Sequence, residues 1–252
     1  MSGTSIGTYL ARAVAMAACL SGAAGQARAQ GPASPRAQAP IDLTGYWVSV
    51  VHEDWRFRMV VPPKGDFPNI PLNDEGRKVA SAWDPAREPA DSCRAFGAPN
   101  IMRQPGRLQI TWADDTTLRI ETDAGLQTRL LRFGAAARSR APQWQGESTA
   151  EWVGLAAVEP GPQGLGQAAR AGALKVVTAR IRPGYLQPNG VPYSGDAVMT
   201  EYFDVVREPN GDEWLVVKSI VEDPRYLTRS FIRSTHFKKQ ADGSGWNPSP
   251  CR

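Results

Sequence analysis

The sequence predicts a mainly β protein: a single antiparallel meander β-barrel of about eight or nine strands with one short helix. Two observations predict this fold. Short segments between residues 107 and 238 alternate apolar and polar side chains with period two, as half-buried strands do. Turn residues separate these segments, and Pro209-Asn210-Gly211-Asp212 is a strong hairpin signal because Asn-Gly adopts a turn that matches strand twist. Closure into a barrel is expected because it removes exposed sheet edges.

The N-terminal residues have the features of an export signal. Arg12 precedes a short apolar run, and Ala27-Arg28-Ala29 gives the small-x-small pattern that a signal peptidase cleaves. We therefore expect a signal peptide over residues 1–29 and a periplasmic or secreted protein. No segment is apolar over enough residues to span a bilayer, so we expect no membrane span. The Pro- and Ala-rich residues 30–41 predict a disordered tether, which leaves residues 42–252 as the β-barrel domain.

The elements follow from local patterns. A β-rich run over residues 43–51 continues through residues 55–61 as one long bent strand or two. Asn73 is placed to cap a helix that ends before Asp84-Pro85, because the residue before proline avoids the α region. Residues 160–172 predict a loop without periodicity. The remaining predicted strands are residues 107–112, 118–120, 128–133, 146–153, 174–181, 198–206, 214–221 and 230–238.

The charge balance argues against polyanionic partners. The chain has 29 basic and 25 acidic residues, a net charge of +4. Without Arg12 and Arg28 of the signal peptide the excess falls to two, and basic side chains alternate with acidic ones instead of clustering. We expect no nucleic acid and no anionic membrane surface as a partner.

Two cysteines remain after the signal peptide, Cys93 and Cys251. In an oxidising compartment an even number of cysteines predicts a disulfide, here between the C-terminal tail and the loop before the main series of strands. A pair of free thiols is the alternative. Two cysteines alone do not make a structural zinc site, which needs four ligands.

The chain has two histidines, His52 and His236. They fall near the end of the first predicted strand and on the last, which are neighbours in a closed barrel. With Asp54 or Glu222 they could form a general acid–base pair or a three-ligand metal site. The simpler interpretation is a surface histidine and a wall histidine that are unrelated in space. The sequence therefore assigns no metal.

A second set of candidates consists of Glu201, Arg129 and Asp123. Glu201 has the strand parity of apolar neighbours such as Phe203, and Arg129 has that of Leu131, so both are expected to point inward. One interpretation is a structural ion pair; the other is a proton-transfer base inside a cavity.

Gly45-Tyr46-Trp47, on the first predicted strand, resembles the G-x-W motif that opens lipocalin-type (calycin) barrels. In that superfamily an arginine of the last strand packs across the tryptophan, which implies Arg229 or Arg233 here. A wider resemblance, to a large and functionally uncharacterised group of secreted bacterial proteins, covers most of the chain after the signal. It implies export and a β-rich fold but no catalytic residue. It rests on Leu72-Asn73-Asp74-Glu75-Gly76-Arg77, Trp83-Asp84-Pro85, Cys93, Gly97-Ala98-Pro99-Asn100-Ile101-Met102, Gly146-Glu147-Ser148, Trp152, Gly190-Val191-Pro192-Tyr193-Ser194, Glu201-Tyr202-Phe203 and Val221-Glu222-Asp223-Pro224.

These observations lead to an exported lipocalin-like barrel that binds a small apolar or aromatic molecule. Its expected wall consists of aromatic side chains and its polar anchor is Arg129 or Glu201; as core residues, the same aromatics would only fill the barrel. The expected wall residues are Trp47, Trp112, Tyr202 and Phe231.

Two other functions remain open. One is a cofactor-free periplasmic isomerase, lyase or hydrolase that uses His52, Asp54, Glu201 or His236 in the barrel mouth. The other is an envelope protein-interaction module whose loops, residues 62–71 and 160–172, meet a partner protein. No nucleotide-binding, metalloprotease or serine-hydrolase motif is present, so no cofactor is expected.

Overall fold

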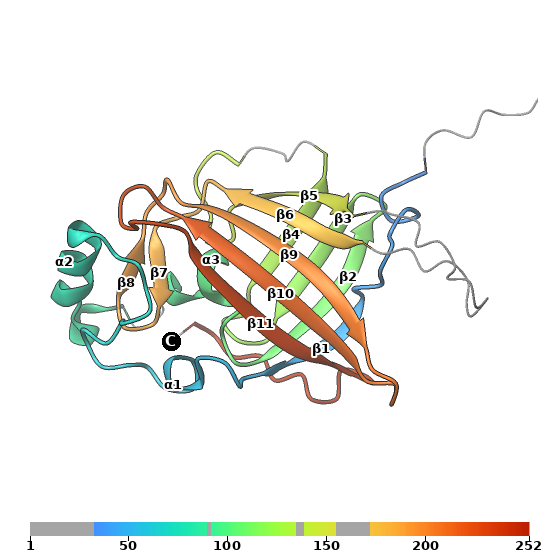
Figure 1. Ribbon diagram of the computed structural model, residues 1–252, viewed down its shortest axis with the longest axis horizontal. Coiled ribbons are helices and arrows are strands. Elements are labelled where there is room, and N and C mark those ends of the chain that lie inside the picture. The colour runs from blue at the N-terminus through green and yellow to red at the C-terminus, as the bar shows by residue number, and fades with distance from the viewer. Residues whose placement is uncertain (1–32, 90–91, 135–138, 155–171, 252) are drawn as a thin grey trace, which may run out of the picture. The chain divides into compact units, whose positions relative to one another are not determined.

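In the computed structural model, residues 33–89, 92–134, 139–154 and 172–251 are described. Their main feature is a closed barrel of nine strands, as the sequence predicts (Figure 1). The predicted signal peptide and most of the predicted loop 160–172 lie outside the described residues. In the order in which they pair around the barrel, the strands are β1 (Gly45–Val50), β11 (Phe231–Gln240), β10 (Glu213–Glu222), β9 (Val198–Arg207), β6 (Ala173–Ala179), β5 (Glu147–Val153), β4 (Thr128–Phe133), β3 (Thr117–Thr122) and β2 (Arg107–Asp114).

The barrel departs from a pure antiparallel meander at one pair, since β4 and β5 run parallel. β4 ends at Phe133 and β5 begins only at Glu147, and a connection of about a dozen residues is long enough to return the chain to the same end of the barrel. Between β6 and β9 the chain also leaves the barrel and forms a small hairpin, β7 (Gly184–Gln187) and β8 (Val191–Tyr193). Period-two patterns do not predict strands this short.

The segment after β1 is not a strand, so the prediction that residues 55–61 continue the first strand or form a second one was wrong. Asp54 adopts a left-handed backbone conformation with φ of 50°, which stops extended structure, and a single-turn helix, α1 (Trp55–Arg58), follows. The predicted helix is present as α2 (Asp74–Ala82), and the Asn73 side chain accepts a hydrogen bond from the Gly76 amide at 2.9 Å. Short helical turns complete the connection to β2: η1 (Pro85–Arg87), η2 (Arg94–Phe96) and α3 (Ala98–Ile101).

One end of the barrel is covered by these short helices and by the β7–β8 hairpin (Figure 1). We call this covering, residues 51–106 and 182–197 as far as they are described, the cap. A second apolar cluster joins it to the barrel, with members such as Leu72, Tyr193 and Phe231 buried between the two. Ile101 and Met102 of the α3 region belong instead to the barrel core, so the cap reaches into this end.

The opposite end is covered by the segment that precedes β1. Residues 33–41, predicted as part of a disordered tether, form a turn that contacts the barrel. Trp152 Nε1 donates to the Pro35 carbonyl at 2.8 Å, and the Arg36 amide donates to the Asp115 carbonyl at 3.1 Å. A proline-rich composition predicts disorder, but composition carries no information about the two hydrogen-bond partners, Trp152 and Asp115, that this segment meets in the fold. Among the described residues, no helix has both the length and the apolar character needed to cross a membrane.

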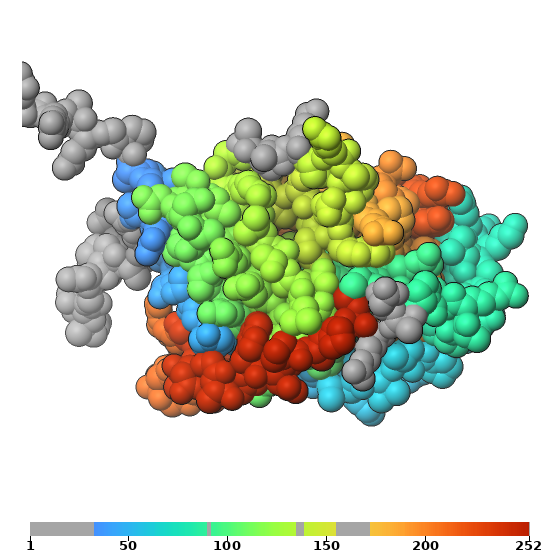
Figure 2. Space-filling view, turned by 180° about the vertical axis from the view of Figure 1, so that it is seen from behind, coloured from blue at the N-terminus to red at the C-terminus, as the bar shows by residue number. Residues whose placement is uncertain are grey.

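Cys93 and Cys251 form the predicted disulfide, with Cα atoms 5.1 Å apart. The C-terminal segment reaches this bond along the barrel surface (Figure 2). On the way, Trp246 packs edge-on against Tyr46, and Ser249 pairs with Ala124 after β3. The disulfide therefore fastens the tail to the part of the cap around η2.

Candidate functional site

The tryptophan of the G-x-W motif is a core residue. Trp47 is fully buried and its Nε1 donates to the Leu43 carbonyl at 3.0 Å. A cation of the last strand does pack across its ring, but it is Lys239, with Nζ 5.2 Å from the ring centroid. The expectation of Arg229 or Arg233 was wrong, because Lys239 is the residue that the strand register places opposite Trp47.

Arg129 and Glu201 form a fully buried ion pair inside the barrel. The guanidinium donates from Nη1 to Oε1 at 3.1 Å and from Nη2 to Oε2 at 2.5 Å, and both side chains have no exposed surface. Strand parity predicts this inward pairing. Asp123 does not join it, since its Oδ1 accepts from the amides of Arg107 and Ala124 at the barrel end.

The aromatic residues expected to share one pocket lie in four separate places. Trp47 is in the barrel core, and Trp112 lies towards the uncapped end, stacked on Phe133. Phe231 belongs to the apolar cluster under the cap. Tyr202 faces outward, where Lys218 Nζ lies 4.9 Å from its ring, because it has the opposite parity to Glu201. These four side chains therefore do not share one pocket, and the inward-pointing apolar residues of the described strands pack into one buried core.

Two adjoining pockets lie on the cap. The larger one, of about 720 Å³, has an aromatic and cationic lining that includes Trp144, Tyr185, Tyr226, Arg94 and Arg182. The Arg182 guanidinium lies over the Trp144 ring at 4.4 Å. A flat apolar group can stack in such a lining, and an anionic group can meet the two arginines.

A smaller pocket of about 400 Å³ adjoins the larger one, and its lining is mostly apolar. Trp83, Val61 and Pro188 contribute to it, while Pro89, Ser92 and Tyr185 line both pockets. We call the two together the cap pockets. Tyr185 stands where they meet.

The Tyr185 hydroxyl is held from two sides. It accepts a hydrogen bond from Arg94 Nη1 at 2.9 Å and donates to Glu88. Burial and the hydrogen bond to Glu88 raise the pKa of Tyr185, and the hydrogen bond to Tyr185 raises the pKa of Arg94. The tyrosine therefore stays a neutral donor and the arginine a cation at neutral pH. Cys93, which lines the larger pocket, ties this segment to the C-terminal tail.

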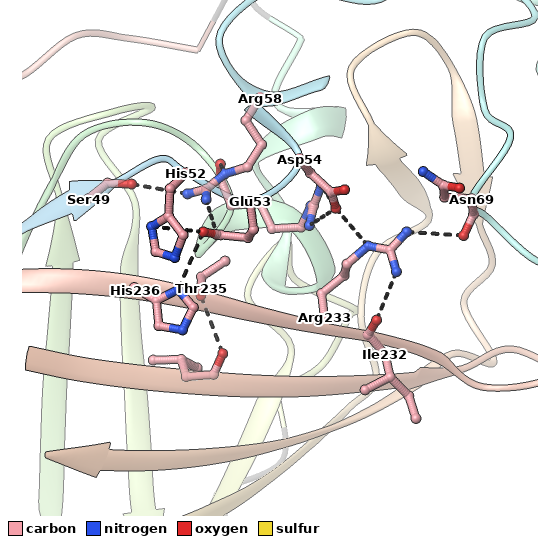
Figure 3. A network of polar contacts seen from close by, with 12 residues as sticks. Ser49, His52, Glu53, Asp54, Arg58, Asn69, Ile232, Arg233, Thr235 and His236 are labelled. Atoms are coloured by element: carbon pink, nitrogen blue, oxygen red, sulfur yellow. Dashed lines mark hydrogen bonds and ion pairs between the residues drawn. The ribbon is translucent and has the colours of Figure 1, made fainter. Parts of the chain in front are cut away.

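The two histidines meet on the outer wall of the barrel. Their rings stack with centroids 4.7 Å apart and planes 22° apart. His236 faces outward from β11, paired with Val50 at the end of β1, and His52 follows two residues later (Figure 3). The simpler interpretation, that they are unrelated in space, was wrong. The carboxylate between them is Glu53, with Oε2 3.5 Å from His52 Nδ1 and 3.3 Å from His236 Nδ1.

Asp54 and Glu222, the carboxylates expected beside the histidines, are engaged elsewhere. Asp54 forms ion pairs with Arg103 at 3.4 Å and Arg233 at 2.9 Å (Figure 3), and Glu222 accepts from Ser230. Burial lowers the pKa of Arg103 to about 10, although the negative charge of Asp54 acts to raise it. Glu201 is sealed inside the barrel, so the four candidate catalytic residues do not form one set.

Sequence reasoning missed Glu53 and most of the cap pockets. Glu53 adjoins His52, and a strand there would put the two on opposite faces; the chain turns at this point instead. Trp144 and Arg182 lie in segments without periodicity and Trp83 lies at the end of the predicted helix, and only the folded chain brings these three residues together.

No protein-family model matches this chain, and neither does any curated protein or solved structure.

Proposed function

We propose that this protein is an exported, lipocalin-like binding protein that holds a small aromatic or apolar molecule in the cap pockets. The observation that carries the proposal is the junction of two pockets at Tyr185, one mostly apolar and one aromatic with two arginines. Their volumes, about 400 and 720 Å³, lie in the range of small-molecule sites. The molecule's apolar part would lie against Trp83 and an acidic group would meet Arg182.

Export and the lipocalin-like character have separate support. The Cys93–Cys251 disulfide suits an oxidising compartment outside the cytoplasm. The closed barrel, with a cation of its last strand over Trp47, suits a lipocalin-like barrel. The proposed place of binding differs from that in a hollow barrel, because Phe203, Phe237 and the Arg129–Glu201 pair occupy the interior.

A fluorescent aromatic sulfonate, 1-anilinonaphthalene-8-sulfonate, tests the site in the oxidised native protein. We expect saturable binding at one site, weakened more than about tenfold by Trp83→Ala through lost apolar contact and severalfold by Arg182→Gln through lost charge. Trp214→Phe is the matched control, since Trp214 lies on the outer wall beside Lys238. Binding that all three variants leave unchanged would place the probe elsewhere and reject the proposal.

A protein-interaction function is the second candidate, favoured by one observation. Trp55, Met59, Val60 and Val61 are each more than half exposed and lie close together along the chain. Such a run is typical of a docking surface. The double variant Trp55→Ser, Val60→Ser would then lose a cross-linked partner in cells while keeping probe binding in the cap pockets. Unchanged cross-linking would reject this candidate.

A further inference from the structure

The chain has two histidines, and the fold stacks their rings on each other with both Nδ1 atoms beside one carboxylate oxygen. His52 comes from the turn after β1 and His236 from β11, so the fold and not the local sequence brings them together (Figure 3). The ligand-capable atoms of His52, Glu53 and His236 all lie within 4.8 Å of one another. This cluster is separate from the cap pockets.

Glu53 is held so that one oxygen remains free for the histidines. Its Oε1 pairs with Nη1 of Arg58, whose side chain is 1% exposed. Arg58 is fixed in turn, because Nε donates to the Arg103 carbonyl at 2.9 Å and Nη2 to Ser49 Oγ at 3.0 Å. The buried guanidinium therefore orients the carboxylate as the partners of metal ligands usually do, with Oε2 directed at both imidazoles.

His236 is oriented in the same way. Its Nε2 lies 3.3 Å from Ser234 Oγ, on the same face of β11. If Nδ1 binds a cation, Nε2 carries the proton and donates a hydrogen bond to Ser234 Oγ. This hydrogen bond fixes the tautomer that a metal ligand needs. His52 lies outermost, with 59% of its side chain exposed, so the cluster is open to solvent.

We propose that His52, Glu53 and His236 form a divalent-cation site of the Zn²⁺ class. Zinc–ligand bonds of about 2.0–2.1 Å place tetrahedral ligand atoms about 3.3–3.4 Å apart. The two Nδ1–Oε2 distances, 3.3 and 3.5 Å, match two edges of that tetrahedron. Two neutral imidazoles and one carboxylate suit zinc, and the exposed side leaves a fourth position for water or a ligand.

The test is calorimetric titration of Zn²⁺ into the oxidised protein, purified without a histidine tag. We expect one ion per chain, with affinity reduced at least tenfold by His52→Gln and by His236→Gln. Glu222→Gln is the matched control, since it removes an exposed carboxylate outside the cluster and should leave the affinity unchanged. His52→Gln is the decisive variant because an exposed side chain can be replaced without disturbing the fold.

Nuclear magnetic resonance gives an independent readout. The protein holds two imidazoles, so a long-range ¹H–¹⁵N spectrum contains two ring systems, and Zn²⁺ should shift Nδ1 of both at one equivalent. The absence of one-to-one binding, binding that survives His52→Gln, or ring nitrogens that do not shift would each overturn the proposal. In those cases the cluster is a carboxylate-bridged histidine stack without a cation.

Discussion

At the scale of single residues, the interior is dominated by the buried pair of Arg129 and Glu201. Two charges removed from water are tolerated here because each carboxylate oxygen accepts one guanidinium hydrogen bond. The pair joins β4 to β9 across the barrel, with β5 and β6 between them in the wall. It fills space that a ligand would need.

We predict that Arg129→Met lowers the free energy of unfolding by about 3–5 kcal/mol, because it leaves the Glu201 carboxylate buried without its partner. The double variant Arg129→Met, Glu201→Leu should recover most of the loss. Urea unfolding measures both. A double variant that is less stable than Arg129→Met would mean that the pair stabilises the barrel by more than mutual neutralisation.

Tyr193 is the second residue with a distinct prediction. Its hydroxyl is buried, has no hydrogen-bond partner among the described residues, and burial raises its pKa far above the usual value of about 10. The folded protein therefore keeps its proton at a pH where the unfolded chain has lost it. The contribution of the protonated Tyr193 hydroxyl to the free energy of unfolding is therefore fully present below pH ~10 and is lost as the pH rises above that value.

We predict that Tyr193→Phe removes this alkaline loss and raises stability at neutral pH by about 1 kcal/mol, since no partner is left unpaired. Urea unfolding at neutral pH and again just above pH ~10 tests both parts. Destabilisation at neutral pH would show that the hydroxyl has a partner, contrary to this account.

At the scale of elements, helix α2 is held close to the segment before β11. A Cβ atom on Gly76 would lie 2.7 Å from the Tyr226 carbonyl oxygen and 2.9 Å from Leu72 Cδ2. Helix propensity favours alanine over glycine by about 1 kcal/mol, whereas this close approach opposes it. Backbone cannot yield as the end of a side chain can.

We therefore predict that Gly76→Ala destabilises the protein, although a helix in isolation would gain from it. Val79→Ala, at an exposed position of the same helix, is the comparison and should change stability by less than about 1 kcal/mol. Thermal unfolding of the two variants distinguishes the effects. A raised Tm for Gly76→Ala would show that α2 is free to move away from Tyr226.

Element patterns explain which parts of the fold could be predicted. Long alternating strands and the Asn210-Gly211 turn depend on local chemistry, and the structure contains them. The α1 turn depends on one backbone conformation at Asp54, which no residue pattern there signals. The parallel β4–β5 pair depends on where a long connection returns, which is a property of the whole chain.

The candidate site was harder to predict for the same reason. Parity along one strand is enough to turn Arg129 and Glu201 inward. The contact of His52 with His236 requires the register between the first and last strands, and the cap pockets require several aperiodic segments to meet. Only closure of the barrel and docking of the cap determine those positions.

At the scale of the whole molecule, the disulfide joins the C-terminal tail to the cap. It closes a loop of 158 positions, which corresponds to about 5 kcal/mol in the chain-entropy model of cross-links. Cys93 also lines the larger cap pocket, so the bond supports the proposed binding surface as well as the fold.

We predict that the double variant Cys93→Ser, Cys251→Ser loses several kcal/mol of stability and binds 1-anilinonaphthalene-8-sulfonate more weakly at temperatures where it is still folded. Urea unfolding and probe titration measure the two effects. Full binding by the reduced and folded protein would show that the cap keeps its shape without the bond.

We propose that this protein binds its ligand on the cap and not inside the barrel. Native mass spectrometry of the oxidised protein from its own cells tests it most directly, with Trp83→Ala for the cap pockets and Phe203→Leu for the interior. We predict a small molecule that stays with the wild type and with Phe203→Leu but is absent from Trp83→Ala. A wild type that carries nothing, or a small molecule that stays with Trp83→Ala but is absent from Phe203→Leu, would rule out binding on the cap.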